Sequence, residues 1–253
     1  MSEEMQKHEY ARLAQRESFY FWNIGRREIL REALLRHLSP RDDLAILDVG
    51  CGSGGNIKLL DGFGRVTGLD VSEEALKFAK NYNFARLVQA DAKDIPFSDN
   101  SYDLVTSLDV FEHIENDQKA LQESFRVLKN GGLVLITVPA HPWLWSDHDE
   151  AMLHQRRYTR SEILKKVRET GFEILGYSNF VFLGVPVNFL RKIRESFFRK
   201  FIPQKSRAVE TYDIEFSRKT NDFLLSWLRL EKFLIKFISL PLGTSIFIIA
   251  KKL

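Results

Sequence analysis

Short apolar runs alternate with amphipathic segments over the first half of the chain. The runs at 45–50, 65–71, 85–91, 102–109 and 132–139 are rich in β-branched residues, which is typical of buried strands. The segments between them have apolar residues at helical spacing, and this alternation predicts a parallel sheet with helices on both faces. Sheets of this kind bind ligands at the carboxyl ends of their strands.

Composition and charge narrow the class of protein. With 44% hydrophobic and 28% charged residues among 253, the chain predicts a folded domain and excludes a disordered or fibrous protein. The formal net charge of +3 is low for a nucleic-acid-binding protein, so we expect no nucleic-acid partner. The single cysteine, Cys51, excludes an internal disulfide. Without a signal-peptide core or a long apolar span, we expect a cytoplasmic protein, or one peripheral on the inner face of a membrane.

Four glycines lie within residues 50–55, directly after the first predicted strand. Glycine permits positive φ and lets a ligand approach the backbone amides closely. Gly50, Gly52 and Gly55 also satisfy the G-x-G-x-x-G spacing of dinucleotide-binding turns, with Asp70 at about the position of a ribose-binding carboxylate. On this spacing alone, a dinucleotide site, another nucleotide site and a turn without a ligand all stay open.

Further motifs resemble class I S-adenosylmethionine-dependent methyltransferases. Asp48 begins the stretch "DVGCGSG", which resembles the first motif of that family, and "GLDVS" at 68–72 resembles the second. Residues 90–114 resemble the rest of its cofactor-binding part. The resemblance implies an α/β, doubly wound, mostly parallel seven-stranded sheet. The sixth strand corresponds to 171–180, and the antiparallel last strand to 243–253.

The same resemblance implies S-adenosyl-L-methionine as the cofactor and S-adenosyl-L-homocysteine as its product. It assigns Asp70 to the ribose hydroxyls, Asp91 to the adenine amino group, and Asp48 to the ammonium group or to bracing of the loop. The other expected cofactor-binding residues are Gly50, Cys51, Gly52, Val71, Ala92, Leu108, Asp109, His113, Trp22 and Arg26. Trp22 and Arg26 belong to an N-terminal segment expected to close over the cofactor, with packing on the sheet as the alternative.

Polar and aromatic residues are dense at 139–164, after the fifth predicted strand. Such residues are poor core material, and loops at this edge bind acceptors in this fold, so we predict an acceptor wall. A salt-bridged lid that organises the fold is the alternative. We expect no metal site, because the histidines match no familiar zinc spacing. The candidate bases are His113, His148 and His154, and the expected substrate-binding residues are Trp143, Trp145, Asp149, Arg156, Arg157 and Tyr158.

The chain is expected to divide into an N-terminal helical cap (1–44), a Rossmann-like core (45–180), a basic aromatic helical insert (181–240) and the last strand (241–253). Residues 181–207 have the composition of a helix in a membrane interface, so we expect peripheral membrane contact there. A helical hairpin or a homodimer contact is the alternative.

The functional hypothesis is O-methylation of a small or lipid-linked acceptor. The "HQRRYT" loop and the basic insert resemble methyltransferases associated with glycan and lipid-linked sugar pathways. Two alternatives stay open: N- or C-methylation of a small molecule, and a non-catalytic regulator that binds S-adenosylmethionine.

Overall fold

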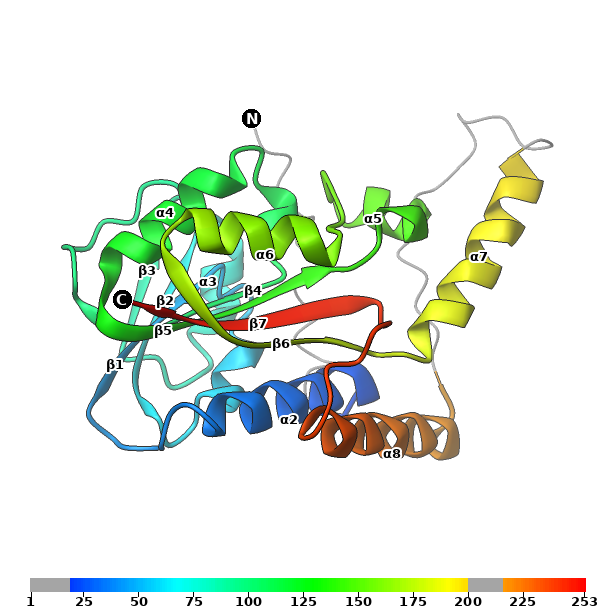
Figure 1. Ribbon diagram of the computed structural model, residues 1–253, viewed down its shortest axis with the longest axis horizontal. Helices are drawn as coiled ribbons and strands as arrows, with labels where there is room; N and C mark the ends of the chain where they lie inside the picture. Colours follow the sequence, from blue (N-terminus) through cyan, green and yellow to red (C-terminus); the bar gives the residue numbers. More distant parts are fainter. Residues whose placement is uncertain (1–18, 200–215) are drawn as a thin grey trace.

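One sheet of seven strands organises the chain (Figure 1). The computed structural model describes residues 19–199 and 216–253, with side chains up to Arg194 in the first range. The strand order is β3-β2-β1-β4-β5-β7-β6; β1 to β5 pair in parallel, and β7 is antiparallel to both β5 and β6. This confirms the predicted fold class. The strands are β1 (Leu44–Val49), β2 (Gly64–Asp70), β3 (Arg86–Gln89), β4 (Tyr102–Leu108), β5 (Leu128–Pro139), β6 (Phe172–Phe180) and β7 (Ser245–Lys252).

Helices cover both faces of the sheet. α4 and α6 lie on one face, and α2 and α8 lie on the other (Figure 1). Ser72 is the N-cap of α3, because its hydroxyl accepts a hydrogen bond from the Ala75 amide at 3.3 Å. The helices are α2 (Phe21–Leu35), α3 (Glu73–Ala79), α4 (Asp117–Val127), α5 (Asp147–Ala151), α6 (Arg160–Glu169), α7 (Gly184–Arg199) and α8 (Arg218–Ile235), with 3₁₀ turns η1 (Gly55–Leu59), η2 (Phe111–His113) and η3 (Pro142–Leu144).

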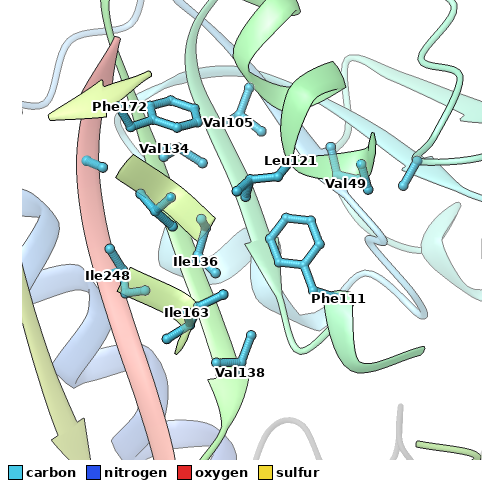
Figure 2. Packing of buried hydrophobic residues seen from close by; sticks show 14 of the residues in the cluster. Val49, Val105, Phe111, Leu121, Val134, Ile136, Val138, Ile163, Phe172 and Ile248 are labelled. Carbon is cyan, nitrogen blue, oxygen red and sulfur yellow. The ribbon is translucent and has the colours of Figure 1, made fainter. Parts of the chain in front are cut away.

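Alternate strand residues supply two separate cores, as the period of two in a strand requires. Figure 2 shows the first, in which side chains of β1, β4 and β5 pack against Leu121 of α4 and Ile163 of α6. The second core joins the opposite strand faces to Leu30 of α2 and Leu228 of α8. Burial of each such side chain contributes about 1.5–3 kcal/mol to the free energy of unfolding. The helices on both faces therefore stabilise the sheet.

The second helix of the predicted insert is part of this core. A Cβ on Gly25 of α2 would lie 2.4 Å from a methyl carbon of Leu228, so the glycine allows α8 to approach closely. Arg229 and Lys232 of α8 each form an ion pair with Glu28 at 2.8 Å. The buried Glu231 accepts backbone hydrogen bonds where β6 leads towards α7. The helix α8 therefore packs on α2, and it helps to hold α2 against the sheet.

The first helix of the insert, α7, extends away from the sheet beside η3 (Figure 1). The Trp143 ring meets the Phe189 ring edge-on, with centroids 6.1 Å apart. Three apolar side chains of α7, Val187, Leu190 and Ile193, are more than half exposed. Among the described helices, none is long and apolar enough to cross a membrane. Part of the predicted membrane-contact segment 181–207 lies outside the described residues.

Candidate active site

Two groups of residues meet at the carboxyl edge of the sheet. The first, called here the cofactor half, comprises residues 48–56, 70–72 and 91, which lie at or just after the carboxyl ends of β1, β2 and β3. The second, the acceptor half, comprises residues 109–117 and 140–158, which follow β4 and β5. Parallel strands bring these ends together although the segments are far apart in sequence.

The glycine loop of the cofactor half is a tight turn against the end of β2. Gly50, Gly52 and Gly54 have φ of +69°, +55° and +96°, which side chains other than glycine rarely adopt. The Gly50 and Cys51 amides donate to the Leu69 carbonyl at 2.7 and 3.0 Å. A Cβ on Gly52 would meet no atom within 4 Å. The loop thus keeps open space beside its backbone, as a cofactor at close approach requires.

Asp70 is held in one orientation beside this loop. Its two carboxylate oxygens accept from the Gly52 amide at 2.8 Å and the Ser72 amide at 2.9 Å. Burial raises the pKa of Asp70, while these two hydrogen bonds oppose the shift. The two carboxylate oxygens together have about four lone pairs, so these amides leave acceptor capacity on Asp70. A carboxylate presented this way fits two neighbouring hydroxyls of a ribose.

Asp48 lies beneath the loop and is buried. One carboxylate oxygen accepts from the Thr106 hydroxyl at 2.6 Å, and the other has no partner among the described residues. Burial raises the pKa of Asp48 to about 7. An unsatisfied acceptor here fits the ammonium group of a methionine-like moiety. Neighbouring Cys51 is buried, and burial raises the pKa of its thiol, so it is a filler of the turn and not a nucleophile.

An ion pair ties α2 to the edge between the two halves. Arg26 of α2 contacts the Asp109 carboxylate and the Thr137 hydroxyl, each at 2.8 Å, and Thr137 donates to Asp109 at 2.9 Å. Asp109 has φ of +58°, so the chain turns sharply after β4. Arg26 also reaches Asn56 of the glycine loop at 3.4 Å. The N-terminal helix therefore fixes the first residue after β4 relative to the loop after β1.

The acceptor half is held by hydrogen bonds between its two segments. The Gln155 amide donates to the Glu112 carbonyl, and the Gln155 side chain donates to the His113 carbonyl, both at 2.8 Å. Arg156 donates to the Glu115 carbonyl at 2.9 Å. This pairing brings the rings of His113 and His154 edge to face, with centroids 4.9 Å apart.

A buried carboxylate orients one of these histidines. Asp149 is fully buried; His154 Nδ1 lies 2.9 Å and Arg157 Nε 2.7 Å from the same carboxylate oxygen. Burial raises the pKa of Asp149, but these two hydrogen bonds outweigh burial and hold the pKa well below its usual value. An ionised carboxylate only accepts, so Nδ1 of His154 carries a proton, and in the neutral ring Nε2 is the nitrogen with the lone pair.

An apolar groove of about 340 Å³ adjoins the acceptor half. It lies between the turn after β5 and the start of α7, so it joins the loop to the insert. Its lining residues are Trp143, Phe182, Val185, Pro186, Phe189 and Leu242.

Comparison with known proteins agrees with this geometry. Residues 47–136 match the family described as "Methyltransferase domain". Demethylmenaquinone methyltransferase of Staphylococcus aureus is 34% identical over 125 residues, covering 46% of this chain and 52% of that protein. Cycloartenol-C-24-methyltransferase 1 of Oryza sativa is 28% identical over 190 residues, covering 63% and 54%. The chain spans about half the length of these curated relatives.

A solved structure extends the match to the whole fold. Phosphoethanolamine N-methyltransferase 2 of Haemonchus contortus, in complex with S-adenosyl-L-methionine, has a TM-score of 0.56 and 22% identity, covering 96% of this chain and 60% of that one. Residues 47–136 are thus similar to a methyltransferase domain, and 96% of the chain shares the fold of this solved structure.

Within the methyltransferase domain, several predicted cofactor residues lie at the cofactor half. Val71 is 55% exposed next to Asp70, and Asp91 is partly exposed, paired with Lys93 at 3.4 Å. Leu108 and Ala92 are buried near the strand ends. Trp22 stacks on Phe180 of β6, which favours the packing alternative for this residue.

Three of the predicted acceptor contacts are buried in the structure. Asp149 and Tyr158 are fully buried, and the Tyr158 hydroxyl donates to Asp117 at 2.8 Å. Arg157 is buried against Asp149 and also donates to the Ala140 carbonyl. The contacts of these side chains in the structure are with other protein groups, which favours the salt-bridged alternative, in which they organise the loop.

The remaining predicted acceptor residues are more accessible. Trp143 is 44% exposed on the groove, while Trp145 and Arg156 are half-buried. His148 is less accessible, because its Nδ1 is buried, and burial lowers its pKa to about 4. Burial likewise lowers the pKa of His113 to about 4.

The sequence reasoning missed several residues that shape both halves. The Thr106 and Thr137 hydroxyls donate hydrogen bonds to Asp48 and Asp109, respectively. Asp117 accepts hydrogen bonds from Tyr158 and, at 2.7 Å, from Lys166. Glu112 is fully buried beside His113. The available signal was a charged or hydroxylated residue inside an otherwise apolar run, as in "LVTSLDVFEHI".

Proposed function

We propose that this protein transfers the methyl group of S-adenosyl-L-methionine to an oxygen atom of a small or lipid-linked acceptor. The observation that carries the proposal is His154, held by the buried Asp149 beside His113. A hydroxyl acceptor reacts faster when a positioned group takes its proton, and Nε2 of His154 has a lone pair for that purpose.

The chain's own residues have separable tasks in this reaction. Asp70 would hold the ribose hydroxyls, Asp91 the adenine amino group, and Asp48 the ammonium group of the donor. The bound donor supplies an already activated methyl group, so the protein mainly aligns the acceptor and excludes water. Arg156, which is half-buried at the acceptor half, would then contact an anionic part of the acceptor.

The apolar groove supports an acceptor with a hydrophobic portion. Its described lining is entirely apolar, with Trp143 and Phe189 forming an aromatic wall. The names of the two curated relatives refer to a sterol and a quinone, both largely apolar molecules. A groove of this volume would hold part of a lipid chain or ring next to the reacting group.

Methyl transfer to a panel of acceptors tests the proposed function. Phenolic, lipid-linked sugar and amine compounds would be incubated with the protein and labelled S-adenosyl-L-methionine, and the products identified by mass spectrometry. We expect label on oxygen, and loss of that product in the His154→Ala variant. Label on nitrogen or carbon would support the alternative reactions. Binding of the donor without transfer to any acceptor would support the regulator.

The exposed face of α7 supports peripheral membrane contact as part of this function. Leu190 and Ile193 are 65% and 51% exposed, and basic residues lie on the same helix. Each basic residue near an anionic surface contributes about 1 kcal/mol of attraction. We expect the protein to sediment with anionic vesicles at low salt and to be released at high salt. Replacing Leu190 and Ile193 by serine should weaken sedimentation, whereas unchanged sedimentation would exclude α7 as the contact.

A further inference from the structure

We infer that Glu112, His113 and His154 form a binding site for a divalent transition-metal ion, with zinc as the best-fitting species. One carboxylate oxygen and one ring nitrogen from each histidine lie within 4.8 Å of one another. The three residues come from the two segments of the acceptor half, so the site exists only in the folded protein. Two histidines and one glutamate are a ligand set that zinc uses where it keeps an open coordination position.

Glu112 is buried, with 0% exposure, and has no hydrogen-bond partner among the described residues for either side-chain oxygen. The guanidinium groups that act on it are already engaged, Arg26 with Asp109 at 2.8 Å and Arg157 with Asp149 at 2.7 Å. A buried carboxylate without a partner is costly, so the site requires a proton or a cation.

The two histidines beside Glu112 favour a bound cation over a proton on its carboxylate. His154 Nδ1 donates to Asp149, and a ring nitrogen of His113 is engaged by the Leu153 carbonyl. Each ring therefore keeps its other nitrogen as an acceptor. Histidines that bind metals have this arrangement, in which an outer carboxylate or carbonyl fixes the tautomer and directs the free nitrogen at the ion.

Small side-chain movements would complete the site. In a tetrahedral zinc site with ligand bonds of about 2.1 Å, the ligand atoms lie about 3.4 Å apart, so the present ligand atoms must converge by up to about 1.4 Å. Rotation of partly accessible His154, whose side chain is 11% exposed, provides the simplest route. The sequence predicted no metal site, because the histidines match no familiar zinc spacing. The fold brings His154 to residues that precede it by about 40 positions.

Metal binding stands independently of the proposed function, but its role rests on that function. The lone pair of His154 would bind the ion and would no longer act as a free base. The open position would hold the acceptor oxygen, and a hydroxyl bound to zinc loses its proton more readily.

The test measures metal content and affinity in the full chain. Zinc would be added to metal-free protein in a calorimeter, and cobalt would be added to record the visible absorption bands of the bound ion. We expect one zinc per chain and cobalt bands typical of four or five ligands. Glu112→Gln and His154→Ala should each lower the affinity more than about 10-fold, and Asp149→Asn by about 10- to 100-fold.

His141→Ala is the matched control, because it removes a histidine of the same loop outside the trio. It should bind zinc like the original protein, and melting curves would show which variants are folded. If Glu112→Gln unfolds, the cobalt spectrum of the original protein tests the site instead, because its bands report how many ligands the bound ion has. Absence of stoichiometric zinc, or equal loss in His141→Ala, would overturn the metal site. Retained methyl transfer by metal-free protein would overturn the catalytic role of the ion and leave the proposed function standing.

Discussion

The two halves of the carboxyl edge are built by different means. In the cofactor half, Asp70 is fixed by amides 2 and 18 residues away, within one turn and its neighbouring strand end. In the acceptor half, the bonds of Arg156 to Glu115 and of Tyr158 to Asp117 each join residues 41 positions apart. A short-range site leaves a motif in the sequence, whereas a long-range site depends on the completed fold. Single substitutions in the cofactor half should therefore change mainly cofactor affinity. Substitutions in the acceptor half should change both the rate of methyl transfer and the stability of the fold.

The largest effect is expected for His154→Ala. Loss of a positioned proton acceptor or metal ligand should lower kcat by about 10²- to 10⁴-fold. Affinity for S-adenosyl-L-homocysteine should stay within about twofold, because His154 belongs to the acceptor half. Methyl-transfer rates and calorimetry on one preparation measure both. Cofactor affinity that falls as much as kcat would show that the two halves do not act separately.

Asp70→Ala should act in the opposite way. Removing an acceptor for two ribose hydroxyls should weaken cofactor binding by about 2–3 kcal/mol, which is roughly 30- to 150-fold. Asp91→Ala is the matched comparison, since this carboxylate is more exposed and should contribute less. Calorimetry with S-adenosyl-L-homocysteine measures both affinities. An equal or larger loss for Asp91 would reverse the assignment within the cofactor half.

Asp48→Asn should make the fold more stable, by an amount that increases with pH. The unfolded chain releases this proton near pH 3.8, but the folded protein keeps it until about pH 7, so ionisation destabilises the fold progressively between these values. Asparagine removes that cost, and its stabilising effect should grow by about 2 kcal/mol between about pH 5.5 and pH 8. Urea unfolding at both values measures the difference. A constant difference would place the carboxyl pKa outside this range.

The smallest effect is expected for Tyr158→Phe. The variant keeps the buried ring but loses the hydrogen bond to Asp117, which still contacts Lys166 at 2.7 Å. Stability should fall by about 1 kcal/mol, with cofactor affinity unchanged. Urea unfolding and calorimetry provide the two readouts. An unchanged stability together with lost methyl transfer would return Tyr158 to the list of acceptor contacts.

The sequence predicted the sheet and the glycine turn after β1 for a physical reason. Strands buried on both faces must be continuous apolar runs, and the turn after β1 needs glycines where φ is positive. Both constraints are local, so the strand positions and the open loop at Gly52 follow from adjacent residues. The ion pair between Arg26 and Asp109 agrees with the expectation that the N-terminal helix reaches this edge.

The acceptor half could not be predicted residue by residue. Density of polar residues indicated an exposed wall, but Asp149, Arg157 and Tyr158 satisfy one another or Asp117 inside the protein. A polar side chain is a poor core residue only until its partner is known, and the partners here lie on other elements. The insert presented the same difficulty, since nothing near Leu228 in the sequence indicates that it packs against Gly25.

The position of β7 in the sheet determines when β6 can pair during synthesis of the chain. β7 lies between β5 and β6, and among the described strands it is the one that pairs with β6. While the protein is being synthesised, β1 to β5 can pair as they emerge, but β6 has no neighbour until residues 245–252 are made. The nascent chain therefore carries an unpaired strand and the exposed edge of β5 through the synthesis of more than sixty residues between β6 and β7.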